Sequence, residues 1–156
     1  WDPSLSWTDL AWIRSLTSLP IVLKGILRVD DAVRAADEGV DAVIVSNHGG
    51  RQLDATPATL TVLPAIADAV DHRIPVLVDG GIRRGTDVMI ALAYGAAGVL
   101  VGRPILWGLS VDGDRGVEAV LRILTDDLEI AMALCGASTV SDIDRTMVSP
   151  DRIIVP

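Results

Sequence analysis

The sequence predicts an α/β fold, in which short buried strands alternate with amphipathic helices. Four apolar runs rich in β-branched residues each end in a polar residue or a glycine, which is typical of parallel strands buried on both faces. The stretches between these runs carry apolar residues at helical spacing. Of the 156 residues, 50% are hydrophobic but only 3% are aromatic, so the core must consist of Val, Ile, Leu and Ala.

The predicted elements follow one another in a regular order. The strands are expected at residues 20–24, 41–46, 74–79 and 97–102. The helices are expected at residues 6–16, 30–38, 59–70, 86–94 and 116–134, with a last short helix at the capping-box sequence of residues 139–142. Strand–helix units of about 30 residues fit either an open doubly wound sheet or part of a (β/α)8 barrel. A whole barrel needs eight units and about 250 residues, so four units predict half a barrel.

Charge and cysteine content argue against several classes of protein. The chain has 21 acidic and 13 basic residues, and a net charge of −8 argues against nucleic acid as the main partner. The single Cys135 cannot form a disulfide framework or a Cys-rich metal site, so we predict no metal site and a cytoplasmic location. No apolar run approaches the roughly 20 residues that span a bilayer, and no signal peptide opens the chain. The chain begins at Trp1 rather than Met, which we interpret as a processed chain or a piece of a longer one.

Basic side chains gather at the carboxyl ends of the four predicted strands. Lys24 ends the first strand, His48 and Arg51 follow the second, Arg83 follows the third and Arg103 follows the fourth. The loops at this end of the strands carry the chemistry in barrels. Because the chain is acidic overall, this concentration predicts an anionic ligand at one face.

The loops after the third and fourth strands favour a phosphate site. Residues 79–85 read Asp-Gly-Gly-Ile-Arg-Arg-Gly, and glycines allow backbone N–H groups to approach an anion closely. Residues 102–104 read Gly-Arg-Pro and are suited to open a helix whose N–H groups face the same ligand. Either loop alone is better explained as a tight turn with a solvated arginine. Two such loops after consecutive strands favour phosphate binding.

The loop after the second strand predicts a site for a 2-hydroxy acid. Residues 46–54 read Ser-Asn-His-Gly-Gly-Arg-Gln-Leu-Asp, which places His48 three residues before Arg51. Histidine can take a proton near neutral pH, and arginine is suited to bind a carboxylate through two hydrogen bonds. The alternative is a polar surface loop in which Arg51 pairs with Asp54 and His48 caps a carbonyl. Lys24 either extends to solvent or contacts an anion, such as a cofactor that becomes anionic.

These motifs resemble the FMN-dependent 2-hydroxy acid oxidases and dehydrogenases. The similar segments are residues 2–4, 23–25, 46–54, 79–87 and 102–104. Residues 46–54 are specific to that family, whereas the phosphate loops recur in other FMN barrels. The resemblance is to the C-terminal half of the (β/α)8 barrel, strands 5–8 plus the C-terminal helices. It implies that residues 1–156 form half of a single domain, whose partner is the N-terminal half of the same barrel.

The resemblance also implies a role for each candidate site residue. Lys24 would stabilise the reduced, anionic flavin, Ser46 would hydrogen-bond the flavin ring, and Asp79 would contact the ribityl chain. His48 would take a proton from the substrate, and Arg51 would hold the substrate carboxylate. The remaining cofactor-binding residues, of which all but Ile82 are assigned to the FMN phosphate, are Gly80, Gly81, Ile82, Arg83, Gly102 and Arg103.

The activity implied by the resemblance is flavin-dependent oxidation of a 2-hydroxy acid to the 2-keto acid. The segment is most similar to 4-hydroxymandelate and mandelate oxidases, which implies that O2 is reduced to hydrogen peroxide while (S)-4-hydroxymandelate or (S)-mandelate becomes the aryl glyoxylate. L-Lactate or glycolate is the alternative substrate. The resemblance further implies a homo-oligomer, expected to be a tetramer. Two other hypotheses remain open: a different FMN barrel that shares only the phosphate loops, and a non-enzymatic phosphate-binding half-barrel module.

Overall fold

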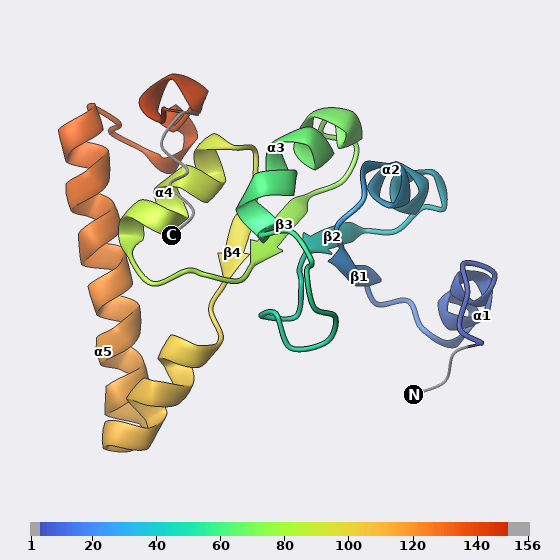
Figure 1. Cartoon of the computed structure of the whole chain (residues 1–156), viewed down its shortest axis with the longest axis horizontal. Coiled ribbons are helices and arrows are strands. Elements are labelled where there is room, and N and C mark those ends of the chain that lie inside the picture. Colours follow the sequence, from blue (N-terminus) through green and yellow to red (C-terminus); the bar gives the residue numbers. More distant parts are fainter. Residues whose placement is uncertain (1–3, 150–156) are drawn as a thin grey trace.

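The computed structural model describes residues 4–149, so Trp1 and most of the first similar segment lie outside the described residues (Figure 1). The strands are β1 (Val22–Ile26), β2 (Ala42–Val45), β3 (Val76–Asp79) and β4 (Gly98–Leu100). The helices are α1 (Asp9–Leu16), α2 (Val29–Asp37), α3 (Thr59–Val70), α4 (Gly85–Ala93) and α5 (Arg103–Cys135), followed by the 3-10 turns η1 (Val140–Asp142) and η2 (Arg145–Met147). All four predicted strands and the alternation with helices are confirmed, but β1 continues to Ile26, so Lys24 lies within the strand rather than at its end.

The strands form one parallel sheet in the order β1-β2-β3-β4, with β1 and β4 at its edges. All four residues of β2 are buried, as expected for a central parallel strand covered on both faces. Consecutive parallel strands bring their carboxyl ends to one edge of the sheet, so the loops that follow them become neighbours. This topology gathers the predicted site residues.

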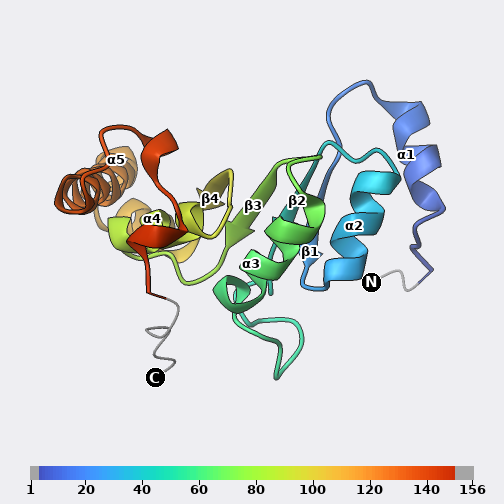
Figure 2. The same cartoon turned by 90° about the horizontal axis from the view of Figure 1, so that it is seen from above.

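The core lies between the sheet and helices α2 and α3, which pack beside each other (Figure 2). Ala32 and Ala35 of α2 and Leu63 and Ile66 of α3 are fully buried in the same cluster as β2 and β3. A second cluster joins α4 to α5 and to the chain that follows α5. The core is aliphatic, as the composition predicts.

Helix α5 differs from the prediction, because it starts earlier and is broken. The predicted opening at residues 102–104 and the predicted helix over 116–134 belong to one element with non-helical backbone at Asp112 and Gly113. The two limbs, residues 103–111 and 114–135, pack closely where Gly108 meets Gly116, and a Cβ on either glycine would collide with the carbonyl of the other. The first limb begins three residues after the end of β4, and this contact holds the second limb against it.

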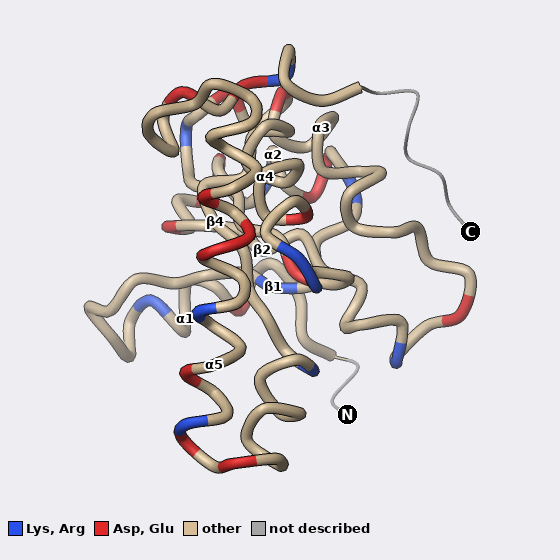
Figure 3. The backbone as a smooth tube through the Cα atoms, turned by 90° about the vertical axis from the view of Figure 1, so that its left-hand side faces the viewer, with Lys and Arg blue, Asp and Glu red and all other residues tan. Residues whose placement is uncertain are grey.

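The second limb of α5 carries both acidic and basic residues (Figure 3). Arg122 pairs there with Glu118 at 2.7 Å, one turn away. Among the helices of residues 4–149, none combines the length and the apolar character needed to cross a membrane.

Candidate active site

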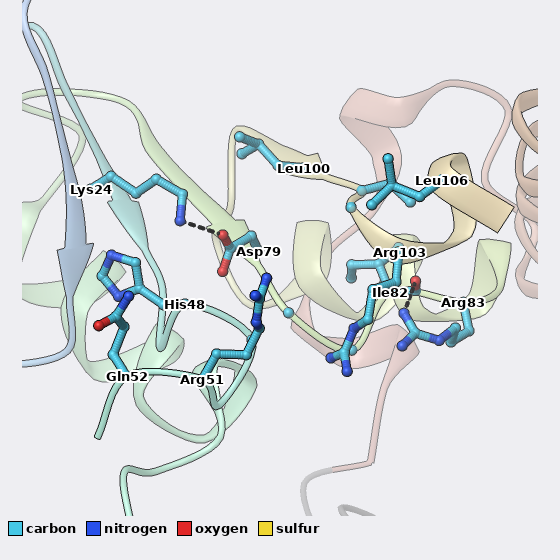
Figure 4. Close-up of a pocket in the computed structure, with 15 residues that line it drawn as sticks. Lys24, His48, Arg51, Gln52, Asp79, Ile82, Arg83, Leu100, Arg103 and Leu106 are labelled. Carbon is cyan, nitrogen blue, oxygen red and sulfur yellow. Dashed lines mark hydrogen bonds and ion pairs between the residues drawn. The ribbon is translucent and has the colours of Figure 1, made fainter. Parts of the chain in front are cut away.

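A cavity of about 530 Å³ opens at the carboxyl ends of the four strands (Figure 4). This volume is in the range of small-molecule sites. Residues of all four strands or of the segments that follow them line it, and ten of them were predicted from the sequence: Lys24, His48, Arg51, Asp79, Gly80, Gly81, Ile82, Arg83, Gly102 and Arg103. The sequence did not single out the other lining residues, which are Gly49, Gln52, Leu100, Val101 and Leu106. Ser46 is the one predicted residue that lies behind the lining.

Lys24 crosses the cavity floor from β1 toward Asp79 at the end of β3. Its Nζ lies 2.8 Å from Asp79 Oδ2 and donates a hydrogen bond of 2.8 Å to Ser46 Oγ. The other carboxylate oxygen, Asp79 Oδ1, is buried and has no hydrogen-bond partner among the described residues. A buried unsatisfied acceptor costs stability unless a donor reaches it. Asp79 therefore fits a ligand that carries hydroxyl groups.

Thr59, the first residue of α3, fixes the main chain next to Asp79. It is buried, and its hydroxyl donates a hydrogen bond of 2.6 Å to the carbonyl of Asp79. A Cβ at Gly80 would lie 3.3 Å from the same hydroxyl, so glycine lets the loop approach α3 closely. Sequence reasoning missed this residue, since the contact joins positions 20 residues apart.

His48 is held in a left-handed backbone conformation, with φ of 56°. Its N–H donates a hydrogen bond of 3.1 Å to Ser46 Oγ, so Ser46 links Lys24 to the His48 loop. A Cβ at Gly25 would lie 2.8 Å from His48 Cε1, so Gly25 leaves room for the imidazole. The ring itself makes no hydrogen bond to the described residues, and the expected alternative, in which it caps a carbonyl, does not form.

The turn after His48 directs Arg51 to the cavity. Asn47 Oδ1 accepts the N–H of Gly49 at 3.1 Å, and the Asn47 carbonyl accepts the N–H of Gly50 at 3.0 Å. Both glycines have positive φ, which this turn requires. Arg51 forms no ion pair with Asp54 or any other described residue, so its guanidinium remains available to a carboxylate ligand.

Five neighbouring backbone N–H groups on the cavity wall make no hydrogen bond within the described chain: those of Gly80, Gly81, Ile82, Gly102 and Arg103. A Cβ at Gly81 or Gly102 would meet nothing within 4 Å, so the space beside the backbone is open. Free N–H donors on a glycine loop and at a helix amino end are suited to a phosphate.

The next residues of the β3 loop have their N–H groups occupied. Asp87 Oδ2 accepts those of Arg83 and Arg84 at 2.8 and 2.9 Å, and Asp127 Oδ2 accepts that of Gly85 at 2.7 Å. Carboxylates thus cap the amino end of α4. The free N–H groups of these two loops are therefore those of residues 80–82 and 102–103, and Arg83 and Arg103 line the same cavity.

These groups fit the FMN that the sequence resemblance implies. The free N–H donors and two arginines suit a phosphate at one end of the cavity, and the unpartnered Asp79 Oδ1 suits a ribityl hydroxyl further in. Lys24 provides positive charge beside Asp79.

Comparison with known proteins agrees with this geometry. The family model for FMN-dependent dehydrogenase matches residues 1–150. The chain is 56% identical over 154 residues to 2-hydroxyacid oxidase 1 of Mus musculus, covering 99% of this chain and 42% of that protein. It is 57% identical over 145 residues to an L-lactate oxidase of Nostoc, covering 93% of this chain and 40% of that protein.

Solved structures show the same similarity. A crystal structure of mandelate oxidase with (S)-2-phenylpropionate superposes with a TM-score of 0.87 at 47% identity, over 90% of this chain and 42% of that one. The chain therefore spans about two fifths of the length of the relatives that it matches. The superposition confirms the α/β fold as the C-terminal half of a (β/α)8 barrel.

Proposed function

The chain belongs to the FMN-dependent dehydrogenase family, and from this premise we propose that it supplies the proton-transfer, carboxylate-binding and phosphate-binding residues of an FMN-dependent 2-hydroxy acid oxidase. One observation carries the proposal: the imidazole of His48 and the guanidinium of Arg51 make no hydrogen bond to the described residues, and both residues line the same cavity as five free N–H donors. Residues 1–156 would form half of one barrel domain, and the N-terminal half would complete the site.

Different residues of the chain would bind the cofactor and the substrate. When bound, FMN accepts the two electrons that the 2-hydroxy acid loses. The free N–H groups of residues 80–82 and 102–103 would hold its phosphate together with Arg83 and Arg103. Asp79 would accept a hydrogen bond from the ribityl chain, and Lys24, which Ser46 and Asp79 hold in place, would favour negative charge nearby.

The substrate would be bound and deprotonated by the loop after β2. Arg51 would hold the carboxylate through charge-assisted hydrogen bonds, which are among the strongest in proteins. The imidazole of His48 would accept a proton from the hydroxyl or the α-carbon of the acid. A positioned base of this kind contributes about 10²- to 10⁴-fold to the rate. The product would be the 2-keto acid, with O2 as the electron acceptor and hydrogen peroxide as its product.

(S)-Mandelate or (S)-4-hydroxymandelate is the proposed substrate, with L-lactate or glycolate as the alternative. The mandelate oxidases among the similar structures support the first, and the lactate oxidase among the relatives supports the second. The homo-oligomer, expected to be a tetramer, and the cytoplasmic location stay predictions. Some relatives carry the word peroxisomal in their names.

Anaerobic titration of the whole enzyme tests the proposal. Addition of each of the four acids should bleach the flavin absorbance. The acid that gives half-maximal reduction at the lowest concentration identifies the substrate. Admission of O2 should restore the colour and release hydrogen peroxide. An enzyme that binds no flavin, or whose flavin none of the acids reduces, would contradict the proposal. Phosphate binding by a folded monomer without flavin would favour the half-barrel module instead.

Substitution of Gly25 tests the role of His48 without removing the imidazole. His48→Gln should bind FMN normally but reduce it at least 100-fold more slowly. Gly25→Ala should also slow reduction, since the new Cβ displaces the ring. Gly39→Ala is the matched control, because Gly39 also has positive φ but a Cβ there meets nothing within 4 Å. Equal effects of the two alanines would show that backbone strain, rather than displacement of His48, is responsible.

A further inference from the structure

Trp107 lies outside the cavity but touches one of its arginines. It is in the first limb of α5, one turn after Arg103. The residue is 54% exposed in the described chain. The guanidinium carbon of Arg83 lies 5.0 Å from the centre of the ring. Arg83 lines the cavity, whereas Trp107 does not. The proposed reaction gives this tryptophan no role.

Arg83 has little else to hold its side chain in place. Its guanidinium donates one hydrogen bond, of 3.1 Å from Nη1 to the carbonyl of Ile82 (Figure 4). No described carboxylate lies within ion-pair distance, although Asp87 is only four residues away and accepts backbone N–H groups at Oδ2. An arginine side chain loses considerable conformational entropy when a ligand orders it. A contact that orders it in advance lowers that cost.

Stacking on a ring orders an arginine without neutralising it. The ring face attracts the cation electrostatically and occupies none of the outward-pointing N–H groups of the guanidinium. An ion pair would instead occupy those groups and cancel the charge. The chain contains a pair that shows the difference: Arg34 stacks on Trp7 at 4.8 Å and is also paired with Glu38 at 3.5 Å. Arg83 is stacked but unpaired.

The backbone next to Trp107 is held by a contact between the two limbs of α5. The limb that carries it packs against the second limb of α5 through Gly108, the next residue in the chain, and Gly116. The second limb in turn supplies Asp127, which binds the N–H of Gly85 in the loop that carries Arg83. The ring and the guanidinium are therefore positioned by the same helix.

We propose that Trp107 is a positioning residue for recognition of the FMN phosphate: its ring holds the Arg83 guanidinium, still fully charged, at the free N–H groups of residues 80–82. The inference rests on the proposed function, since it takes FMN as the ligand. It predicts that Trp107 contributes to affinity only when the ligand carries a phosphate.

The test compares FMN with riboflavin, which lacks the phosphate, on the whole enzyme prepared without flavin. Dissociation constants are measured by quenching of flavin fluorescence. Trp107→Leu should raise the constant for FMN about three- to tenfold and leave that for riboflavin unchanged. Trp107→Phe should restore most of the affinity for FMN, because a phenyl ring also presents an aromatic face.

A double substitution shows whether Trp107 acts through Arg83. In an Arg83→Met background, Trp107→Leu should have no further effect on FMN binding. Trp7→Leu is the control for the general loss of a stacked tryptophan and should leave the ratio of the two constants unchanged. Three results would overturn the inference. Trp107→Leu could weaken the binding of FMN and of riboflavin equally, its effect on FMN binding could add to that of Arg83→Met, or the affinity for FMN could stay unchanged.

The test also separates this inference from the proposed function. If the enzyme without substitutions binds FMN no more tightly than riboflavin, the phosphate site itself is wrong and both fail. If it prefers FMN and Trp107→Leu keeps that preference in full, only the role of Trp107 is overturned.

Discussion

Most described arginines outside the cavity form ion pairs, Arg84 and Arg115 being the exceptions, whereas those that line the cavity form none. Among residues 4–149, six arginines outside the cavity form ion pairs: Arg14, Arg28, Arg34, Arg73, Arg122 and Arg145. The three that line the cavity, Arg51, Arg83 and Arg103, form none with the described chain. With 21 acidic and 13 basic residues, the chain has enough carboxylates to pair every one of them.

The difference in pairing explains how an acidic chain can have a basic cavity. Exposed pairs contribute little to stability, about 0–1 kcal/mol each, but they do neutralise the arginine locally. An unpaired arginine keeps its full charge for a ligand. Lys24 shows an intermediate arrangement, since Asp79 pairs with it through Oδ2 while Oδ1 remains without a partner. The comparison predicts that cavity arginines determine binding and that the paired ones affect only stability.

Arg51→Met gives the largest expected effect. It should raise the half-saturation for the 2-hydroxy acid about 10- to 100-fold, because one charged hydrogen-bonding partner of the carboxylate is lost. Stability should change little, since no described residue loses a partner. Steady-state kinetics and chemical denaturation of the whole enzyme measure the two quantities.

Arg73→Met is the matched control for this substitution. Arg73 pairs with Asp37 at 2.7 Å and lies away from the cavity. The variant should leave the half-saturation unchanged and lower the free energy of unfolding slightly. Unchanged saturation in Arg51→Met would contradict the carboxylate assignment, and a raised value in both variants would remove the distinction between the two groups.

A new carboxylate beside Arg103 would turn a cavity arginine into a paired one. A Cβ at Gly49 would lie 3.6 Å from Arg103 Nη2, and Asp and Asn tolerate the positive φ of this position better than most residues. Gly49→Asp should weaken FMN binding about tenfold relative to Gly49→Asn, because the carboxylate neutralises the guanidinium and repels the phosphate. The two variants have nearly the same shape, so equal FMN affinities would show that the charge of Arg103 does not matter.

The strands and the residues at their carboxyl ends could be predicted because each depends on a short stretch of sequence. An apolar run indicates a buried strand, and the topology then brings His48, Asp79 and Arg103 to one edge. Contacts between distant residues could not be predicted in this way. The Gly85–Asp127 hydrogen bond spans 42 positions, and no local pattern marks it. The occupied N–H groups of residues 83–85, which leave only residues 80–82 of this loop free to bind an anion, could therefore be recognised only in the structure.

The sequence pattern also did not predict how the two limbs of α5 join. The predicted helix over 116–134 is the second limb of α5, and its true start depends on the break at Asp112 and Gly113. The close contact of Gly108 with Gly116 brings the limbs on either side of this break together. The stacking of Trp107 on Arg83 follows from the same arrangement.

Arg145→Met tests the described ion pair whose partners lie furthest apart in the sequence. Arg145 binds both carboxylate oxygens of Asp68, at 2.6 and 3.0 Å, and so ties η2 to α3. Both side chains are about half exposed, so the variant should lower the free energy of unfolding by only about 0.5–1 kcal/mol. FMN affinity and acid half-saturation should not change. A loss of FMN affinity would mean that the paired arginines also support the cavity.

The same pair gives a smaller effect that depends on pH, and its sign can be worked out. The hydrogen bond from Arg145 lowers the pKa of Asp68 below its ordinary value of 3.8. The folded state therefore binds a proton less readily than the unfolded state, and the stabilisation is complete above that ordinary value and is lost as pH falls through the folded pKa. The difference in unfolding free energy between the unsubstituted enzyme and Arg145→Met should be constant near neutral pH and shrink below about pH 4. Denaturation at several pH values measures it, with Asp68→Asn expected to give the same curve as Arg145→Met. A difference that persists at the lowest pH would show that Arg145 stabilises the fold through packing of its stem rather than through its charge.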